Sequence, residues 1–438
     1  MGRLLSRLGG VTSRSNAPSK PVLVAANCWQ PTFRYRDTTN NWTTYDTQHF
    51  VRLGKEAIGE VRIGLCGFYE SDNGAGEADL GNDYTVEASL QIPPPYSGAA
   101  PAYQPFLFNG QKTVTVVNGT ALLMSDPIMV NYQGSAPGAI TGLTIRLSYK
   151  VANSALYVPA GSVPRNLDTG YASTSAATQA FSTTAMSTPA GGSTISPIFM
   201  PHGIYATPAN PLVAVHLSGD SFGEGTGDTP DSTNGLQGWL QRGLNLVNGV
   251  PIPSFNASKG ASRVRPQRIF NPRNKRPMGH CTHVISARLR NDLAVGVGLA
   301  DLQLALVEHW AACKAVKSPY GRPMYVVQTL APPSTNSTDG WATAANQNFT
   351  TPVNLSMFAP GGVRDQINAW IRTQVGVVNA THGIVLLDEV IDPNPAWEDP
   401  SNPGKWLVSG TVDGVHPTNP LTVAAGLILN AAAAKWQP

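Results

Sequence analysis

The chain has 438 residues, more than one ordinary core organises, so we expect two domains. Its formal net charge of +3 is too small for the strongly basic surface of a nucleic-acid binder, so no nucleic-acid partner is expected. Charged residues make up only 13%, whereas 43 glycines and 36 prolines are present, which indicates much β-structure, long loops or both.

Residues 1–20 predict a polar N-terminal arm. They carry arginines but no continuous apolar segment, so they do not resemble a secretion signal. No apolar run in the chain is long enough to span a membrane. We therefore expect a protein that stays in the cytoplasm, is released by lysis or is carried on a virion, and the sequence does not choose among these.

Residues 21–207 predict an all-β domain, either a β-sandwich or a jelly roll. LTIRLSYKV (143–151) alternates apolar and polar residues, as a half-buried strand does, and turn-forming residues separate it from the other strand candidates. The Ser/Thr/Gly-rich region 152–200 is too long for a simple connector, and it is either an ordered cover over a neighbouring surface or a flexible linker. The other predicted strands are 60–69, 84–92, 111–117 and 126–132.

Residues 208–438 predict a second, α/β domain. Short apolar strands alternate there with amphipathic helices, which indicates a parallel sheet covered on both faces. The predicted strands are 212–218, 283–289, 324–332 and 382–390, and the predicted helices are 236–247, 299–316, 363–375 and 420–436.

The clearest candidate for catalysis is Ser221 in LSGDSFGEG (217–225), directly after the first strand of the α/β domain. Ligand sites in parallel sheets lie at the carboxyl ends of strands. A serine nucleophile needs a histidine base oriented by an acid. TVDGVHPTN (411–419) supplies Asp413 and His416, whose spacing on one loop lets the carboxylate fold back onto the imidazole.

GDSFG (219–223) also fits the GxSxG nucleophile elbow, but that fold places several strands before the serine and separates the acid from the histidine. The arrangement here resembles the GDSL, or SGNH, hydrolases. Gly219-Asp220-Ser221 matches the first block of that family, and Gly260 matches the second. Asn291 and Asp292 match the third, although Leu289 stands where the family has glycine, and Asp413 and His416 match the last.

The resemblance covers 208–438 and implies a three-layer α/β/α, flavodoxin-like parallel-sheet domain. It extends more loosely to esterases with an N-terminal β-domain, through VRIG (61–64), GQKTVTV (110–116) and SDPI (125–128). By the resemblance, the protein is a cofactor-free serine esterase, and its expected substrate is an acylated, most readily an O-acetylated, polysaccharide or a small ester. Ser221 would attack the acyl carbon, His416 would act as base and Asp413 would orient it. The N–H groups of Ser221 and Gly260 and the amide of Asn291 would hold the oxyanion.

The basic segment 263–276 (RVRPQRIFNPRNKR) follows Gly260 and could border the mouth of this site. There it would attract an acidic substrate, although a solvated basic loop is the commoner outcome. The candidate substrate-binding residues in it are Arg263, Arg265 and Arg268.

Other patterns are weaker, and no metal site is expected. His280 and His283 in HCTH suggest a zinc site, but on a strand they would point to opposite faces. The acids after the nucleophile, Glu224, Asp228 and Asp231, fit no standard calcium loop. The four cysteines form no CxxC pair, so buried free thiols are favoured, with one disulfide in each half left open: Cys28, Cys66, Cys281 and Cys313.

A rival interpretation is a structural or glycan-binding protein, such as a spike or fibre subunit of a virion, with or without esterase activity. The low charge and the Ser/Thr/Gly-rich stretch suit it, and Trp29, Trp42 and Tyr45 could form a sugar-stacking platform, although core packing is the usual fate of such aromatics. A homo-oligomer or a virion assembly stays open on either interpretation.

Overall fold

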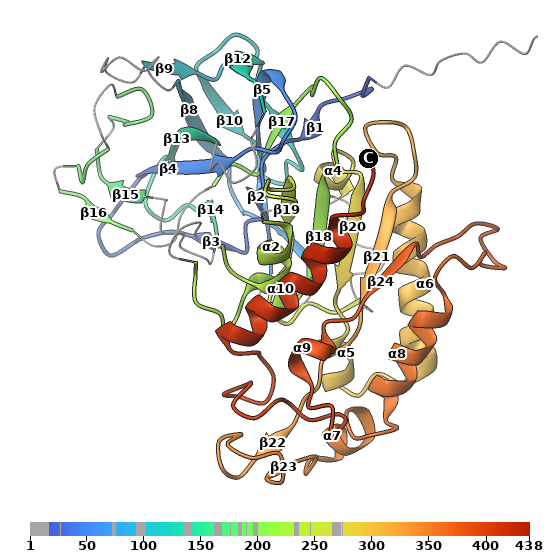
Figure 1. Ribbon diagram of the computed structural model, residues 1–438. Coiled ribbons are helices and arrows are strands. Elements are labelled where there is room, and N and C mark those ends of the chain that lie inside the picture. Colours follow the sequence, from blue (N-terminus) through green and yellow to red (C-terminus); the bar gives the residue numbers. More distant parts are fainter. Residues whose placement is uncertain are drawn as a thin grey trace, which may run out of the picture.

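The computed structural model describes residues 17–438 except 27, 72–75, 93–101, 135–141, 162–168, 176, 183–185, 190, 196–199, 232–235, 246, 265–272 and 274. Figure 1 shows antiparallel sheets in the N-terminal half of the chain and a parallel sheet with helices in the C-terminal half. Most of the predicted arm, residues 1–16, lies outside the described part.

Two antiparallel sheets form the N-terminal region. The larger has the order β10-β8-β13-β4-β15-β16, with β9 beside β8, and the smaller has the order β1-β17-β5-β11, with β12 beside β5. Buried side chains of both sheets, such as Ile63 of β5 and Ile145 of β13, share one apolar cluster, so the predicted all-β region is confirmed. The strands of the larger sheet are β4 (Thr44–Arg52), β8 (Tyr84–Ile92), β9 (Ala102–Pro105), β10 (Thr113–Val116), β13 (Gly142–Lys150), β15 (Thr169–Ser173) and β16 (Ser193–Thr194). Those of the smaller are β1 (Val22–Leu23), β5 (Ile58–Leu65), β11 (Leu123–Met124), β12 (Ile128–Tyr132) and β17 (Gly203–Ala206).

The Ser/Thr/Gly-rich region is an ordered cover where the structure describes it. It supplies β15 and β16 to the larger sheet, and residues between these two strands contact polar side chains of β13. There the N–H of Ala180 donates to Ser148 Oγ at 3.1 Å, and Arg146 donates to the carbonyl of Ser182 at 2.8 Å. Arg146 and Ser148 are therefore buried as well as the apolar residues of β13, and the middle of the predicted half-buried strand is covered on both faces.

The C-terminal region contains the predicted parallel sheet, in the order β2-β19-β18-β20-β21-β24. All its pairings are parallel. Its edge strand β2 comes from the N-terminal half, so a division at residue 208 does not separate the two regions cleanly. The strands are β2 (Cys28–Trp29), β18 (Val215–Gly219), β19 (Ser254–Asn256), β20 (His283–Ala287), β21 (Tyr325–Thr329) and β24 (Glu389–Ile391).

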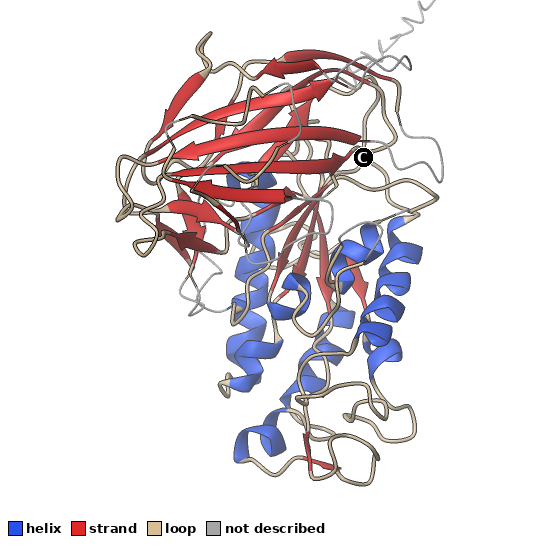
Figure 2. Cartoon of the chain, turned by 90° about the vertical axis from the view of Figure 1, so that its left-hand side faces the viewer, coloured by secondary structure: helices blue, strands red, loops and turns tan. Residues whose placement is uncertain are grey.

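Helices cover both faces of this sheet, which confirms the three-layer α/β/α arrangement (Figure 2). Side chains of a strand point alternately to the two faces of the sheet. Leu217 and Ile285 lie on the face that α2 (Trp239–Leu244) and α10 (Asn419–Ala433) cover. Val284 lies on the other face, under α6 (Leu299–Ala315) and α8 (Val363–Thr373). Among the described residues, no helix combines the length and the apolar character that crossing a bilayer needs.

The predicted strand 382–390 is wrong over most of its length, since only Glu389–Ile391 form β24. The Asn379 side chain accepts the N–H groups of Thr381 and His382, and Gly383 has a φ of 65°, so the chain turns back there. All four cysteines are buried and free. The remaining short elements are β3 (Phe33–Tyr35), β6 (Phe68–Glu70), β7 (Glu77–Asp79), β14 (Val158–Ala160), β22 (Asn336–Ser337), β23 (Gln347–Asn348), α1 (Ser221–Glu224), α4 (Lys275–Met278), α5 (Arg290–Ala294), α7 (Pro352–Met357) and α9 (Asn394–Trp397).

Candidate active site

Ser221 is the first residue of α1, at the carboxyl end of the central strand β18. The Asp220 side chain caps this one-turn helix by accepting the N–H of Phe222 at 3.1 Å. Two glycines let the turn lie against the next strand loop, because a Cβ on Gly219 or Gly223 would stand 2.4 or 2.3 Å from Ser258 Oγ. Close packing around the serine therefore favours glycine at positions 219 and 223.

The structure brings Ser221, His416 and Asp413 into one chain of hydrogen bonds. His416 Nε2 lies 2.8 Å from Ser221 Oγ, and His416 Nδ1 lies 2.7 Å from Asp413 Oδ2. An ionised carboxylate only accepts, so Nδ1 carries the proton and Nε2 presents its lone pair to the serine hydroxyl. This is the tautomer that a histidine base needs.

The loop around Asp413 keeps its carboxylate ionised. Its Oδ1 accepts the N–H groups of Val415 and His416, each at 2.8 Å. Burial pushes the pKa of Asp413 upward, but these N–H groups and the His416 ring outweigh burial and hold the pKa below its ordinary value. The three-residue spacing thus fixes both the backbone turn and the contact with the ring.

Gly414 makes this turn possible. Its φ is 75°, in the left-handed region, and a Cβ there would stand 2.0 Å from the carbonyl oxygen of Thr335. The N–H of Thr335 donates to the Gly414 carbonyl at 3.2 Å, so the loop after β21 supports the histidine loop directly.

Replacing Gly414 with alanine should lower kcat by about 100-fold, because a shift of about 1 Å in catalytic groups costs roughly that much. The matched control is Gly383→Ala, at a φ of 65° with no atom within 4 Å of the added Cβ. The control carries the same backbone strain, of about 1–2 kcal/mol, without the collision. Ester turnover and melting temperature of both variants check the prediction, and equal kcat values for the two would contradict it.

The three predicted oxyanion donors have different surroundings. Gly260 lies beside the nucleophile, since a Cβ on it would be 3.9 Å from Ser221 Cβ. Its N–H donates to Glu224 Oε2 at 2.7 Å. Asn291, in the first turn of α5, donates one amide N–H to the carbonyl of Ser262 at 3.2 Å. Among the described residues, no acceptor is found for the N–H of Ser221. The oxyanion role of these groups stays a prediction.

Arg288 is a residue that the sequence patterns did not single out. It is buried, and its guanidinium donates to the carbonyls of Gly219 at 3.0 Å and Ala257 at 2.9 Å. These carbonyls end the strand before Ser221 and start the loop that leads to Gly260. Burial lowers the pKa of Arg288, while Glu70 and Asp220 favour its charge. The sequence feature that could have indicated Arg288 is a charged residue near the end of the predicted strand HVISARL (283–289).

Arg288→Met should lower both the free energy of unfolding, by about 3 kcal/mol, and kcat, because the carbonyls of Gly219 and Ala257 each lose a charged donor, although Gly219 keeps the N–H of Lys259. Arg146→Met is the matched control, since Arg146 is equally buried and donates to Gln48 and Ser182 in the antiparallel sheet. It should lose stability but keep kcat. Urea unfolding and kcat per folded molecule check this, and an unchanged kcat in Arg288→Met would refute the positioning role.

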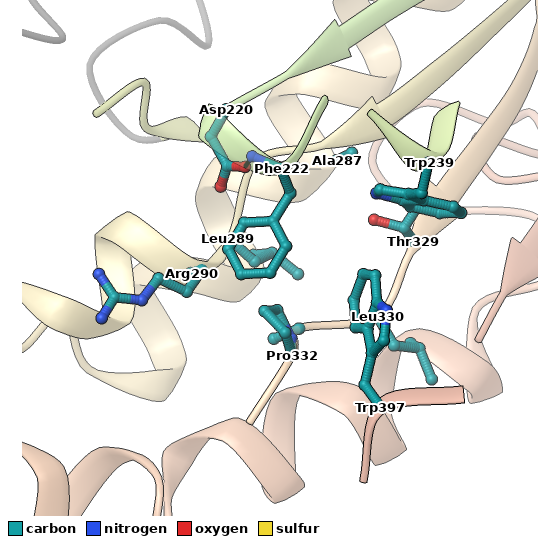
Figure 3. A pocket seen from close by; sticks show the side chains of 11 residues that line it. Asp220, Phe222, Trp239, Ala287, Leu289, Arg290, Thr329, Leu330, Pro332 and Trp397 are labelled. Carbon is teal, nitrogen blue, oxygen red and sulfur yellow. Dashed lines mark hydrogen bonds between the residues drawn. The ribbon is translucent and has the colours of Figure 1, made fainter. Parts of the chain in front are cut away.

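A small cavity lies at the carboxyl ends of β18, β20 and β21, and it is lined by Asp220 and Phe222, the two neighbours of Ser221 in the chain. Its volume is about 20 Å³, and Figure 3 shows Phe222, Trp239 and Trp397 among its walls, with Asp220 and Arg290 on the other side. The Phe222 ring also contacts His416, with 5.4 Å between centroids. Desolvation raises the pKa of Asp220 to about 7, against the N–H of Phe222 and the charges of Arg290 and Arg288. The cavity accommodates about one water molecule or a methyl group.

The structure places some of the other residues that the sequence analysis considered. Of the basic candidates, Arg263 is half-buried beside Ser262, whereas Arg265 and Arg268 lie outside the described residues. In the part of the chain that the structure describes, no three His, Cys, Asp or Glu side chains converge as a metal ion needs. Asp228 instead pairs with Arg242, at 2.8 Å. The suggested sugar-stacking aromatics are in the core: Trp29, Trp42 and Tyr45.

Comparison with known proteins gives structural matches only. No family model matches the sequence, and the curated proteins gave no match either. A protein from Desulfitobacterium hafniense assigned to the GDSL lipolytic family matches 50% of this chain and 98% of its own, with 14% identity and a TM-score of 0.34. A carbohydrate acetylesterase from Sinorhizobium meliloti matches 51% and 100%, with 14% identity and a TM-score of 0.31. A Bacillus subtilis protein matches 87% and 78%, with 11% identity and a TM-score of 0.32.

The matches to the GDSL-family protein and to the acetylesterase thus cover about half of this chain, which also contains separate antiparallel sheets. Identities and TM-scores this low do not assign a function, so a functional assignment has to rest on the geometry of the site.

Proposed function

We propose that this chain is a serine ester hydrolase that acts through an acyl-enzyme. The supporting observation is the hydrogen-bonded chain of Ser221, His416 and Asp413, with distances of 2.8 and 2.7 Å. Ser221 Oγ attacks the acyl carbon while His416 Nε2 takes its proton. His416 then gives that proton to the leaving alcohol oxygen. Water, deprotonated by His416, cleaves the acyl-serine ester and releases the acid.

Asp413 stays ionised throughout and stabilises the imidazolium that forms twice in each cycle. Its low pKa and its two backbone N–H partners support that role. The tetrahedral oxyanion needs preorganised donors, for which we propose the N–H groups of Ser221 and Gly260 and the amide of Asn291.

The test is labelling by a fluorophosphonate and turnover of p-nitrophenyl acetate, for the wild type against Ser221→Ala. We expect the wild type to label at Ser221 and to release p-nitrophenol, and the variant to do neither. A folded wild type that neither labels nor turns over acetyl esters would contradict the proposal and leave the structural spike or fibre as the better interpretation.

Our finer proposal is an acetyl ester of a carbohydrate as substrate. The small, largely apolar cavity beside Phe222 and Trp397 supports a short acyl group. The half-buried Arg263 beside the Gly260 loop would favour an acidic polysaccharide. p-Nitrophenyl acetate should be hydrolysed faster than the octanoate, and acetate should be released from acetylated polysaccharides. A preference for octanoate would refute the short acyl group.

A further inference from the structure

Glu224 places a carboxylate on the donor that the oxyanion would need. It lies three residues after Ser221 on α1, so the two side chains share one face of the turn. Its Oε2 accepts the N–H of Gly260 at 2.7 Å, and a Cβ on Gly260 would stand 3.1 Å from this oxygen. The carboxylate, the Gly260 N–H and the nucleophile are thus immediate neighbours.

This contact conflicts with catalysis. An N–H group carries one hydrogen, and its bond to a carboxylate is charge-assisted and therefore strong. An oxyanion must compete for that hydrogen, and loss of one such donor lowers kcat by about 10²- to 10³-fold. A carboxylate left in place would also repel the negative charge that develops on the substrate oxygen.

The surroundings of Glu224 let it keep its charge after it releases Gly260. Lys259 Nζ lies 3.6 Å from Glu224 Oε1, and the two side chains are only 10% and 12% exposed. The ammonium group is a second partner for the carboxylate on the same loop. Movement of Glu224 toward Lys259 would free the N–H without leaving a buried charge alone.

We propose that Glu224 is a positioning residue that latches the site. In the latched state, its Oε2 occupies the Gly260 N–H, and the tetrahedral intermediate forms only after the carboxylate has moved away. The latch rests on the proposed function, because it gives the Gly260 N–H an oxyanion role. Glu224 would then limit the rate of the chemical step without touching the substrate.

The test compares Glu224→Ala and Glu224→Gln with the wild type in p-nitrophenyl acetate hydrolysis and fluorophosphonate labelling. The alanine variant leaves the N–H free, whereas glutamine still accepts it, but without charge. We expect kcat and labelling rate to rise in the order wild type, glutamine, alanine, with alanine roughly 3- to 100-fold above the wild type. The KM should change little. Amide hydrogen exchange at Gly260 should be faster in Glu224→Ala.

Glu56→Gln is the matched control, because Glu56 is 14% exposed, lies 3.8 Å from Lys55 and accepts a hydrogen bond from Asn210, but lies far from Ser221 in the chain. It should leave kcat unchanged. If all proteins label at the same rate, or if folded Glu224 variants are slower, the latch is overturned while the esterase stands. If none labels at Ser221, the proposed function fails and the latch fails with it. Labelling of the alanine variant alone would support both.

Discussion

Ser221→Ala, His416→Ala and the double variant should all lose about the same activity, on the order of 10⁴- to 10⁶-fold in kcat. The reason is the 2.8 Å bond between His416 Nε2 and Ser221 Oγ. Every proton that the imidazole moves belongs to the formation or hydrolysis of the acyl-serine ester, so once either group is gone the other has little to contribute. Residual turnover would come from binding and from oxyanion donors, which the variants retain.

Steady-state hydrolysis of p-nitrophenyl acetate measures this cycle, with circular dichroism to show that the variants fold. Multiplicative losses in the double variant would mean that the two residues act independently, which the proposed mechanism does not allow.

Asp413→Asn should lower kcat less, by roughly 10²- to 10⁴-fold. An amide can still accept from backbone N–H groups, but it also favours the wrong imidazole tautomer. Asp37→Asn is its matched control. Asp37 Oδ1 accepts the N–H groups of Thr39 and Asn40 in the same turn geometry, without a histidine. Only the Asp413 variant should lose activity.

Much of the fold follows from local patterns in the chain. The strand predicted at 84–92 has the same first and last residues as β8, and the helix predicted at 299–316 is one residue longer than α6. Both have long periodic runs bounded by turn residues. The two-residue strand β2 has no such run and exists because it pairs with β19. The segment 382–388 is apolar but turns, because Asn379 and Gly383 favour a bend over an extended strand.

Some residues of the site could likewise be predicted from the sequence, whereas others could not. Ser221, Asp413 and His416 could be found because the chemistry demands those residue types, and because Asp413 and His416 share one short loop. Glu224 and Arg288 could not be assigned from the sequence. Their partners are a backbone N–H and two carbonyls on other strand loops, and backbone groups carry no sequence signal. The sequence shows Leu289 at the position where the resembling family has glycine. The effect of Leu289 on Asn291 depends on α5, which starts directly after Leu289.

The eight histidines of the chain link its packing to pH. In five of them desolvation is the main cause that lowers the pKa: His202, His216, His283 and His309 to about 3, and His280 to about 4. They are neutral in the folded protein but titrate near 6.5 when the chain unfolds. Protons therefore bind the unfolded chain preferentially between about pH 6.5 and 4, and stability falls as the pH falls through that range.

We therefore expect the free energy of unfolding to be nearly constant between about pH 7 and 8 and to fall by up to about 1.4 kcal/mol per pH unit for each of these five histidines below pH 6.5. The raised pKa of Asp220 acts the other way, since that carboxyl takes up its proton more readily when folded, and it offsets part of the loss.

His216→Leu isolates one contribution, because neither ring nitrogen has a hydrogen-bond partner among the described residues. Urea unfolding from pH 7.5 to 4.5 should show a shallower slope in His216→Leu and an unchanged slope in the exposed control His382→Leu. If the free energy of unfolding of the wild type did not change with pH, or if all three proteins had equal slopes, desolvation would not be what keeps the buried rings neutral.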